Sequence, residues 1–413
     1  MVTTLQLPVL PVRLDNFQHP IQVHNVIERP LPPILHEMES TGIMLDREKL
    51  QVVGAEIERL IGEVELGELA NINYRSSVQL SSLLYDKLRL PVLGKTPGGK
   101  PSTDEKTLRK LKGRVHTSVE LDALLELRGL EKLKGTYVDS LLRRTLDGKF
   151  LHFTINQMGT ETGRMSAEDP NTQNIPAHTH LGDMIRDSFI AEDGMELVVA
   201  DYSQIELRVM AVYAQEPYLL NAFMRDEDVH QAVTDMLGVG SRHIGKTLNF
   251  GVGYGMEAYA LAGRMGVSVA EARRFLQMYW ERLQALRRWI RGEKEWVVRY
   301  GWVSTMFGQY NYYEVGENEG ENGAQLRSAV NMKVQGSAAG IMKMLLPHAY
   351  RIAHQYGGSP LFPVHDEILM KVREGKGEEA AQELADVGSR IVDLGIPMPM
   401  SVGVGHSWKE GKK

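Results

Sequence analysis

Two short apolar runs, far apart in the sequence, each lead into acidic residues. Residues 197–208 read LVVADYSQIELR, so the first run ends at Asp201. Residues 359–372 read SPLFPVHDEILMKV, and the polar triplet HDE, which contains Asp366, interrupts the second run. An apolar run that ends in a carboxylate is typical of a buried strand, and a polar interruption between two such runs indicates a hairpin turn. We therefore predict a sheet of distant strands in which Asp201 and Asp366 meet.

Two carboxylates on distant strands suit a site for a pair of divalent cations. In such sites the ions lie about 3.5–4 Å apart and hold the attacking and leaving oxygens of a phosphoryl transfer. Mg²⁺ suits this arrangement because it binds few protein carboxylates and keeps several waters and substrate phosphates. Taken alone, Asp201 also fits a strand-terminal residue that caps the next helix. The second acid favours the metal site.

Residues 241–255, SRHIGKTLNFGVGYG, place two cations and two aromatic rings at four-residue intervals. On an α-helix, Arg242, Lys246, Phe250 and Tyr254 form a stripe that drifts slowly round one side. Cations match a triphosphate and flat rings match a base, so this stripe suits a nucleotide that lies along the helix. An ordinary amphipathic surface helix is the alternative. It fits less well, because the aromatic residues share the cationic stripe instead of opposing it.

The composition excludes several classes of protein. The chain has 413 residues, 43% hydrophobic and 24% charged, which is ordinary for globular domains with a sizeable core. It has no cysteine, and this excludes disulfides, thiolate catalysis and cysteine zinc sites. No apolar run approaches the ~20 residues of a membrane span, and the N-terminus lacks a signal pattern. A cytoplasmic protein without a membrane partner is therefore expected.

The net charge of −6 argues against a nucleic-acid binder, but the charge is unevenly distributed. Residues 1–85 carry 6 Lys and Arg against 11 Asp and Glu, whereas residues 86–150 carry 15 against 9. A basic segment inside an acidic chain is compatible with a local contact to a phosphate backbone. A solvated helical face explains the same charges equally well.

Strand patterns occur in two blocks, with helical sequence before and between them. Residues 1–26 are aperiodic and contain several prolines, and we interpret them as an extended leader or the remnant of a domain boundary. Before residue 150 we expect a helix over 30–42 and helices over most of 46–146, with a Gly-, Pro- and Lys-rich loop at 94–103. The first strand block then has a strand at 150–156, a loop at 160–176 and a strand at 196–201. It is followed by helices over 203–300, a β-ribbon at 301–315, an acidic loop at 316–323, one or two helices over 324–355, a hairpin at 360–373 and a helix at 376–394. This pattern predicts one mixed α/β core with two helical additions.

An ordered set of motifs covers about residues 27–410. These motifs are TPGGKPST at 96–103, LRGLEKLKGTY at 127–137, TGRMS…PNTQNIP at 162–176, DYSQIELR at 201–208, R-x₃-K-x₃-F-x₃-Y at 242–254, R-x₃-N-x₃-Q-G at 327–336 and VHDE at 364–367. The set resembles the polymerase domain of the bacterial DNA polymerase I family, the family A DNA polymerases. In this resemblance the first two motifs belong to the thumb, DYSQIELR and VHDE to the palm, and the cationic helix to the fingers.

The resemblance implies a right-hand polymerase fold of the α/β (α+β) class, with an antiparallel palm sheet and a mainly helical thumb and fingers. The implied segments are a leader at 1–26, the thumb at 27–150, the palm at 151–208 and 325–413, and the fingers at 209–324. The implied activity is template-directed addition of dNTPs to a primer 3′-hydroxyl by two-metal phosphoryl transfer. The implied partners are primer-template DNA and dNTPs, the implied cofactor is two Mg²⁺ ions that Mn²⁺ can replace, and a monomer is expected.

The resemblance also implies a role for individual residues. The expected metal ligands are Asp201, Asp366 and the Tyr202 carbonyl, with Glu367 as a neighbouring catalytic acid. Arg242, Lys246 and His230 are expected to hold the triphosphate, and Lys246 to protonate the leaving pyrophosphate. Phe250, Tyr254 and Gln204 are the expected contacts of the incoming nucleotide, and Glu206 the gate that excludes a ribose 2′-hydroxyl. The expected DNA contacts are Arg164, Asn174, Arg327, Asn331, Gln335 and His365.

The sequence departs from the family pattern at three places. About 26 residues precede the expected thumb, too few for a nuclease domain, so neither proofreading nor 5′-nuclease activity is expected. Ser241 stands where the family often has a second arginine, and FGQYNYY at 307–313 lacks the arginines common in that ribbon. We expect a phosphate or template contact to be missing at Ser241 and a template contact to be missing in the ribbon.

Two other functions remain open. A single-subunit RNA polymerase-like nucleotidyltransferase shares the palm acids and the lysine-bearing helix, but Glu206 disfavours ribonucleotides. A catalytically silent module that binds primer-template would keep the shape without the chemistry, but every expected metal and phosphate residue is present. A finer expectation concerns Phe250, whose ring carries no hydroxyl and should disfavour dideoxynucleotides.

Overall fold

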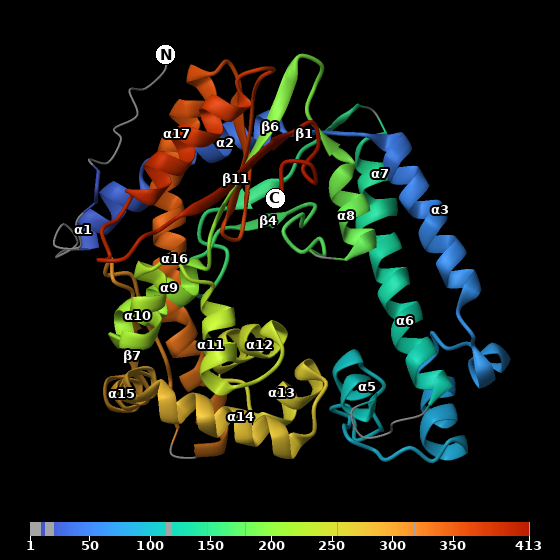
Figure 1. Cartoon of the computed structure of the whole chain (residues 1–413). Helices are drawn as coiled ribbons and strands as arrows, with labels where there is room; N and C mark the ends of the chain where they lie inside the picture. Colours follow the sequence, from blue (N-terminus) through green and yellow to red (C-terminus); the bar gives the residue numbers. More distant parts are fainter. Residues whose placement is uncertain are drawn as a thin grey trace. The chain divides into compact units, whose positions relative to one another are not determined.

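The computed structural model describes residues 10–12, 20–112, 118–146, 148–177, 179–253, 255–316 and 319–412 (Figure 1). Contacts within the chain divide it into two compact units. Unit 1 comprises Met1–Met44, Phe150–Asn174 and Phe189–Lys413. Unit 2 comprises Leu45–Lys149 and Ile175–Ser188.

The central element of unit 1 is a four-stranded antiparallel sheet in the order β11-β6-β10-β9. Its strands are β6 (Met195–Tyr202), β9 (Ser359–Val364), β10 (Glu367–Arg373) and β11 (Met400–Gly405). In the register of β6 and β10, Glu367 lies opposite Asp201 and Arg373 lies opposite Met195. Strands β9 and β10 form the hairpin predicted at 360–373. The mixed α/β class and the antiparallel sheet of distant strands are therefore confirmed.

Helices and aromatic side chains cover this sheet. Helix α17 (Gly377–Ser389) packs on β11 and β6, α16 (Glu319–Gln355) on β10 and β9, and α2 (Leu31–Thr41) on β9 (Figure 1). The Phe362 ring of β9 contacts Phe153 and Trp408, at centroid distances of 5.2 and 5.4 Å. All six residues of β9 are buried, which explains why all but Ser359 are apolar. The sheet is therefore a firm support for the loops at its edge.

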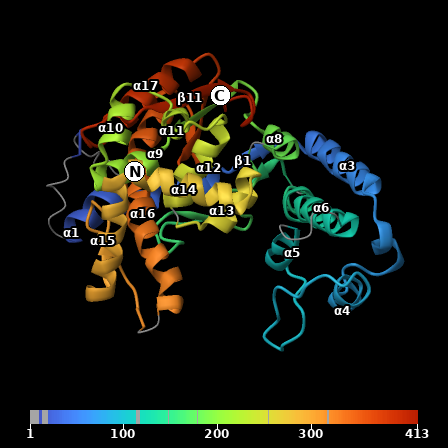
Figure 2. The ribbon, with the colours of Figure 1, turned by 60° about the horizontal axis from the view of Figure 1, so that its bottom comes forward.

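A group of helices and a β-ribbon lie between β6 and α16 in the sequence. They are α9 (Ile205–Ala214), α10 (Pro217–Met224), α11 (Val229–Leu237), α12 (Arg242–Gly253), α13 (Ala258–Met265), α14 (Val269–Arg282), α15 (Gln284–Tyr300), β7 (Trp302–Ser304) and β8 (Tyr310–Tyr312). Figure 2 shows α12, α13 and α14 next to one another. Helix α11 packs closely on α12 because Gly245 has no side chain: a Cβ there would lie 2.2 Å from the His230 carbonyl oxygen. The predicted helical region and ribbon are confirmed.

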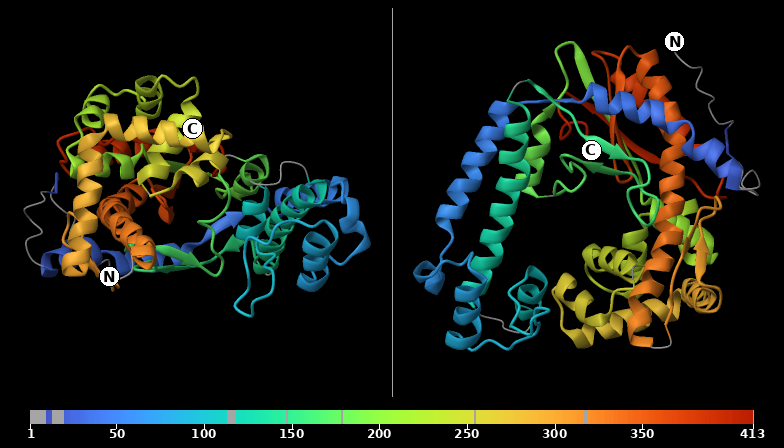
Figure 3. Two further views of the ribbon diagram at one scale, coloured as in Figure 1. Left: turned by 90° about the horizontal axis from the view of Figure 1, so that it is seen from below. Right: turned by 180° about the vertical axis from the view of Figure 1, so that it is seen from behind.

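Unit 2 is helical in the part of the chain that the structure describes. Its elements are α3 (Arg47–Glu63), η3 (Gly67–Asn71), α4 (Ser77–Ser81), η4 (Ser82–Lys87), α5 (Glu105–Lys112), α6 (Val119–Leu133), η5 (Lys134–Asp139), α7 (Ser140–Arg144) and α8 (His180–Asp187). Helix α3 packs on α6 and on α8, and Figure 3 shows α3 and α6 side by side. Leucines such as Leu84, Leu108 and Leu124 form a buried cluster. The helices predicted over 46–146 are confirmed for the described residues.

The short strands differ from the prediction. The segment 150–156 forms two strands in different sheets: β2 (Phe150–Leu151) pairs with β1 (Ile43–Leu45), and β3 (Thr154–Asn156) pairs with β4 (Ser166–Glu168). Strand β4 therefore lies inside the segment predicted as a loop. Strand β5 (Phe189–Ile190) completes the sheet of β1 and β2. Strand β11 was not predicted, because two glycines and a preceding proline-rich stretch weaken its pattern.

Two helical boundaries also differ from the prediction. Residues 20–26, predicted as extended leader, belong to α1 (Pro20–Val23) and η2 (His24–Glu28), which are too short to show a periodic pattern. Residues 1–9 and 13–19 of that leader lie outside the described residues. Helix α16 is one helix that begins inside the predicted acidic loop. Residues 27–44, predicted as thumb, belong to unit 1, because α2 packs on β9 and α16.

None of the helices in the described ranges is long and apolar enough to cross a membrane.

A buried ion pair joins η2 to α16. Lys343 Nζ lies 2.8 Å from Glu28 Oε1, and the two side chains are 0% and 10% exposed. The amides of Gln309 and Gln157 also donate to the Glu28 carboxylate, at 2.8 and 2.5 Å. A buried carboxylate with four donor contacts is satisfied. Lys343 is its only cation partner among the described residues, so the loss of Lys343 leaves the charge uncompensated.

We predict that Lys343→Met lowers the free energy of unfolding by about 3–5 kcal/mol in urea titrations, because Glu28 keeps its charge inside the protein. Adding Glu28→Gln should restore more than about half of that loss, because it removes the buried charge. The control is Arg351→Met on the same helix, which breaks a more exposed pair with Glu383 and should cost less than about 1 kcal/mol. A Lys343→Met loss no larger than that of the control would contradict the prediction.

Candidate active site

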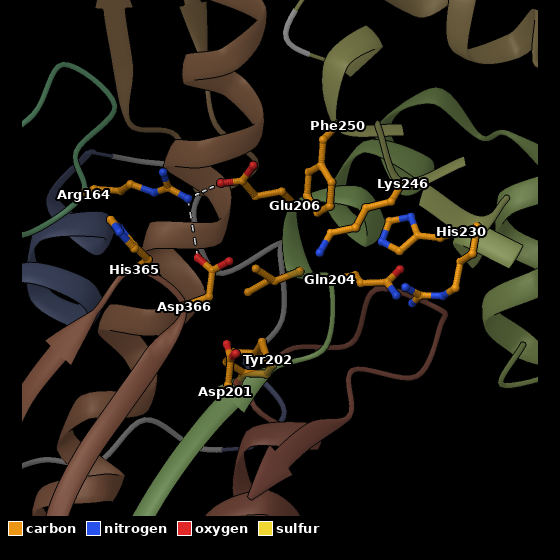
Figure 4. Close-up of a pocket in the computed structure, with 12 residues that line it drawn as sticks. Arg164, Asp201, Tyr202, Gln204, Glu206, His230, Lys246, Phe250, His365 and Asp366 are labelled. Atoms are coloured by element: carbon orange, nitrogen blue, oxygen red, sulfur yellow. Dashed lines mark hydrogen bonds and ion pairs between the residues drawn. The ribbon is translucent and has the colours of Figure 1, made fainter. Parts of the chain in front are cut away.

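A cavity of about 520 Å³ lies beside the C-terminal end of β6 and the N-terminal end of β10. Helices α9, α11 and α12 and the turn between β9 and β10 contribute to its wall (Figure 4). The lining residues are Arg164, Asp201, Tyr202, Gln204, Ile205, Glu206, His230, Arg242, Lys246, Phe250, His365 and Asp366. All of them belong to unit 1, and all except Ile205 carry a site role in the interpretation of the sequence.

The two acids come from adjacent strands of the sheet. Asp201 is the next-to-last residue of β6, before the chain enters α9, and Asp366 lies in the turn between β9 and β10. The Tyr202 amide donates a hydrogen bond of 3.1 Å to the Asp366 carbonyl oxygen, so the backbone holds the two positions together. His365, beside Asp366, has a φ of 54°, a left-handed conformation that a tight two-residue turn requires. Figure 4 shows both carboxylates at the same cavity.

Arg164 connects two carboxylates of the cavity. Its Nη2 atom pairs with Glu206 Oε1 and lies 3.5 Å from Asp366 Oδ1. Burial raises the pKa of Glu206 to about 7, although Arg164 opposes this change. Burial also raises the pKa of Asp366, again against the effect of Arg164. A further cation in the cavity would therefore stabilise the charged forms of these buried acids and lower their pKa values.

These residues fit a divalent cation that shares its coordination with a substrate. Within the described ranges, no cluster of three His, Cys, Asp or Glu residues could enclose a metal ion by itself. Asp201, Asp366 and the Tyr202 carbonyl offer the few oxygen ligands that Mg²⁺ takes when waters and phosphates complete its shell. Gln204 Oε1 is a further buried oxygen of the cavity, and it has no hydrogen-bond partner among the described residues. Such an atom is open to a ligand or a water.

The opposite wall of the cavity is cationic. Arg242 and Lys246 lie one helical turn apart on α12, and both are exposed to the cavity. Arg242 Nε lies 2.6 Å from Asp228 Oδ2, and the Asp228 carboxylate also caps the N-terminus of α11. Phe250 follows on the same stripe, with its ring 5.3 Å from that of His230. The stripe predicted from the sequence is present from Arg242 to Phe250.

His230 lies on α11 between these cations and is 3% exposed. Burial lowers the pKa of its imidazole to about 4; the Asp228 charge opposes this effect, and Arg242 and Lys246 reinforce it. The imidazole is therefore neutral at neutral pH, with one ring nitrogen that donates and one that accepts.

Some predicted site residues lie elsewhere. The Glu367 side chain is 2% exposed and accepts hydrogen bonds of 2.5 Å from Trp408 Nε1 and Lys412 Nζ. It is not part of the cavity wall, because its contacts turn it towards the C-terminal segment. Its backbone lies opposite Asp201, as expected of a neighbouring acid, but its side chain does not line the cavity with Asp201 and Asp366. Tyr254 lies outside the described residues.

The expected DNA contacts are divided between two places. Arg164 and His365 line the cavity. Asn331 and Gln335 are half-buried one turn apart on α16, and neither of them lines the cavity. Arg327 lies on the same helix, with its side chain against Gly255. Asn174 and Ser241 are exposed, and Ser241 directly precedes α12.

The interpretation of the sequence missed residues that contact the site residues without lining the cavity themselves. Asp228 could have been found, because an aspartate two positions before His230 is a typical helix N-cap. Asn249 contacts both Tyr279 and His230. These contacts could not be predicted, because Asn249 and Tyr279 lie in sequences with ordinary helical periodicity. Trp408 and Lys412 belong to a C-terminal segment that carries no motif.

The sequence of this chain is similar to those of known DNA polymerases. The model of the family "DNA polymerase family A" matches residues 45–410. The thermostable DNA polymerase I of Thermus thermophilus is 37% identical to this chain, over 98% of this chain and 50% of that protein. DNA polymerase I of Deinococcus radiodurans is 35% identical, over 100% of this chain and 44% of that protein. The chain spans about half the length of the curated relatives it matches.

A solved structure is also similar. It contains the POL domain of Pol1 from M. smegmatis in complex with DNA primer-template and dNTP. Its TM-score is 0.83 at 33% identity, over 93% of this chain and 70% of that one. The fold is thus the α/β polymerase fold that the motifs indicated. With this fold, and with a family match over most of its length, the chain belongs to DNA polymerase family A.

Proposed function

We propose that this chain is a template-directed DNA polymerase that adds dNTPs to the 3′-hydroxyl of a primer. The observation that carries the proposal is the cavity in which Asp201 and Asp366 face the cations Arg242 and Lys246. Acids on one wall and cations on the other match a metal-bound triphosphate. The M. smegmatis neighbour, which holds primer-template and dNTP, supports the assignment of these partners.

The cofactor that we propose is a pair of Mg²⁺ ions, or Mn²⁺ in their place. Asp201, Asp366 and the Tyr202 carbonyl would hold them. When bound, they would supply the charge stabilisation that the attacking and leaving oxygens need. The contribution of the chain is to hold its two acids in place before any ligand arrives, through the pairing of β6 with β10.

The other residues of the cavity then have distinct tasks. Arg242 and Lys246 bind the triphosphate, and Lys246 gives a proton to the leaving pyrophosphate. His230 contributes a neutral donor, and Phe250 offers a flat face to the new base pair. Arg164 and His365 contact the primer end. Glu206 blocks the space that a ribose 2′-hydroxyl would take.

The domain assignment and the remaining contacts are part of the same proposal. Unit 2 is the thumb, residues 209–324 are the fingers, and the four-stranded sheet with α16 and α17 is the palm. Arg327, Asn331, Gln335 and Asn174 contact the primer-template outside the cavity. A monomeric state and a cytoplasmic location stay predictions from the sequence.

We predict that Asp201→Asn and Asp366→Asn each lower the rate of primer extension by at least about 10³-fold, because an amide cannot replace a charged oxygen ligand of a divalent cation. The measurement is single-nucleotide extension of a labelled primer with Mg²⁺, together with the Kd of primer-template. The Kd should change by less than about threefold, because the acids contact the cations and not the duplex. Asp193→Asn, an exposed acid in the turn before β6, is the control and should extend normally. Normal extension by either site variant would refute the proposal.

We predict that Glu206→Ala raises the incorporation of ribonucleotides relative to dNTPs by about tenfold or more, because the space next to Arg164 becomes open to a 2′-hydroxyl. The measurement is kcat/KM for one NTP and the matching dNTP on the same template. This experiment also tests the alternative of an RNA polymerase-like enzyme. Wild-type protein that prefers NTPs would favour that alternative and overturn the assignment of Glu206.

We predict that Phe250→Tyr lowers the discrimination against dideoxynucleotides by about tenfold or more, because the phenol hydroxyl supplies a hydrogen-bonding group where the missing 3′-hydroxyl leaves none. The ratio of kcat/KM for dNTP and ddNTP measures this change. Phe307→Tyr, a buried phenylalanine outside the cavity, is the control for the added hydroxyl. An unchanged ratio in Phe250→Tyr would show that the ring does not contact the sugar.

A further inference from the structure

A chain of buried side chains runs from α14 through α12 to His230 on α11. Tyr279 is 0% exposed and Asn249 is 2% exposed. The Tyr279 hydroxyl lies 3.2 Å from Asn249 Oδ1, and Asn249 Nδ2 lies 3.1 Å from His230 Nδ1. Tyr279 and Asn249 do not line the cavity, whereas His230 does. They can therefore act on a ligand only through the imidazole.

The surrounding backbone fixes the direction of these hydrogen bonds. Asn249 Nδ2 also lies 3.4 Å from the carbonyl oxygen of Val229, which can only accept. The amide nitrogen, which can only donate, therefore faces both Val229 and His230. The amide oxygen consequently faces Tyr279 and accepts from its hydroxyl. In the reversed orientation the amide oxygen would face the Val229 carbonyl oxygen, and the two acceptors would repel one another.

This direction fixes the tautomer of His230. Because Nδ1 accepts a hydrogen bond from Asn249, Nδ1 carries no proton, and the proton of the neutral ring is on Nε2. The pKa of His230, which burial lowers to about 4, is consistent with a neutral ring at the pH of the cell. The ring then has one N–H left, and the cavity that His230 lines also contains Arg242 and Lys246.

We propose that Asn249, held in place by Tyr279, is a positioning residue that fixes His230 as an Nε2–H donor to the triphosphate of the incoming nucleotide. This inference rests on the proposed function. It adds to that function a reason why a buried, neutral histidine can contribute to a phosphate site beside two cations. A neutral N–H supplies direction without further charge, so it aligns the triphosphate instead of merely attracting it.

The tautomer can be observed directly in the protein without ligand. With ¹⁵N-labelled histidine, long-range ¹H–¹⁵N correlation spectra should give His230 a pyridine-type shift at Nδ1 and a pyrrole-type shift at Nε2. His230→Gln assigns the signals. In Asn249→Asp the carboxylate can only accept, so Nδ1 should become protonated. A protonated Nδ1 in the wild-type protein, or an unchanged pattern in Asn249→Asp, would overturn the inference.

Nucleotide binding tests the role. The Kd of dNTP is measured on a complex with a chain-terminated primer, so that binding is separate from chemistry. Asn249→Leu should weaken dNTP binding about tenfold, and Tyr279→Phe about threefold, because the imidazole loses its orientation wholly or in part. In extension assays the loss should appear in KM, with kcat changed by less than about twofold.

A double-mutant cycle separates this role from a general effect on packing. If Asn249 acts through His230, then Asn249→Leu combined with His230→Ala should bind dNTP no more weakly than His230→Ala alone. Losses that simply add would overturn the inference. Thr234→Val is the matched control, because Thr234 is buried and donates its hydrogen bond of 2.7 Å to the backbone carbonyl of His230 and not to a ring nitrogen. Its Kd should change by less than about twofold.

The outcomes distinguish this inference from the proposed function. A protein with the predicted ¹⁵N pattern that never extends a primer would overturn the proposed function. A polymerase in which Nδ1 is protonated, or in which the cycle is additive, would overturn this inference alone. Thermal unfolding midpoints of all variants show that each is folded at the temperature of the assays.

Discussion

The backbone pairing of β6 with β10 is the interaction on which the site depends. The register places Glu367 opposite Asp201, and the Tyr202 amide binds the carbonyl of Asp366. Two carboxylates that are distant in the sequence thereby meet at one edge of a buried sheet. Hydrogen bonds of the main chain fix their positions, so the acids are held together before any cation shares their charge.

Cationic residues in the rest of the cavity compensate this negative charge. Arg164 lies between Glu206 and Asp366, and the cations of α12 form the opposite wall. The close contact of α11 with α12 depends on Gly245, and it brings the buried His230 beside those cations. Asp228 in turn holds Arg242 at the N-terminus of α11. Arg164, Glu206, Asp366 and Arg242 are therefore paired within the protein alone, and a metal-bound triphosphate offers the same charges in a new combination.

The sequence predicted the elements with long, regular patterns. The strand that ends near Asp201, the hairpin around Asp366 and the cationic helix are present, because each combines a strong local pattern with burial on the sheet or a helix face. Strand β11 escaped prediction because its glycines and the preceding prolines resemble a loop. The segment 150–156 is divided between two sheets because its two halves pair with different strands. A local sequence pattern does not predict such pairing.

Side-chain direction was the least predictable part of the site. Glu367 follows Asp366 directly and looked like a third acid of the cavity, but contacts with Trp408 and Lys412 turn it away. The contact of Asn249 with His230 joins α12 to α11, and the contact of Asn249 with Tyr279 joins α12 to α14. Such contacts depend on the packing of the helices, so they could be seen only in three dimensions.

The central claim is that Asp201 and Asp366 share divalent cations. The most direct measurement is anomalous X-ray scattering from Mn²⁺ in crystals of the chain with primer-template and a non-hydrolysable dNTP analogue. We expect at least one Mn²⁺ peak bonded to carboxylate oxygens of both aspartates and to the phosphates of the analogue. Peaks bonded to neither aspartate, or to only one of them in a complete ternary complex, would contradict the account.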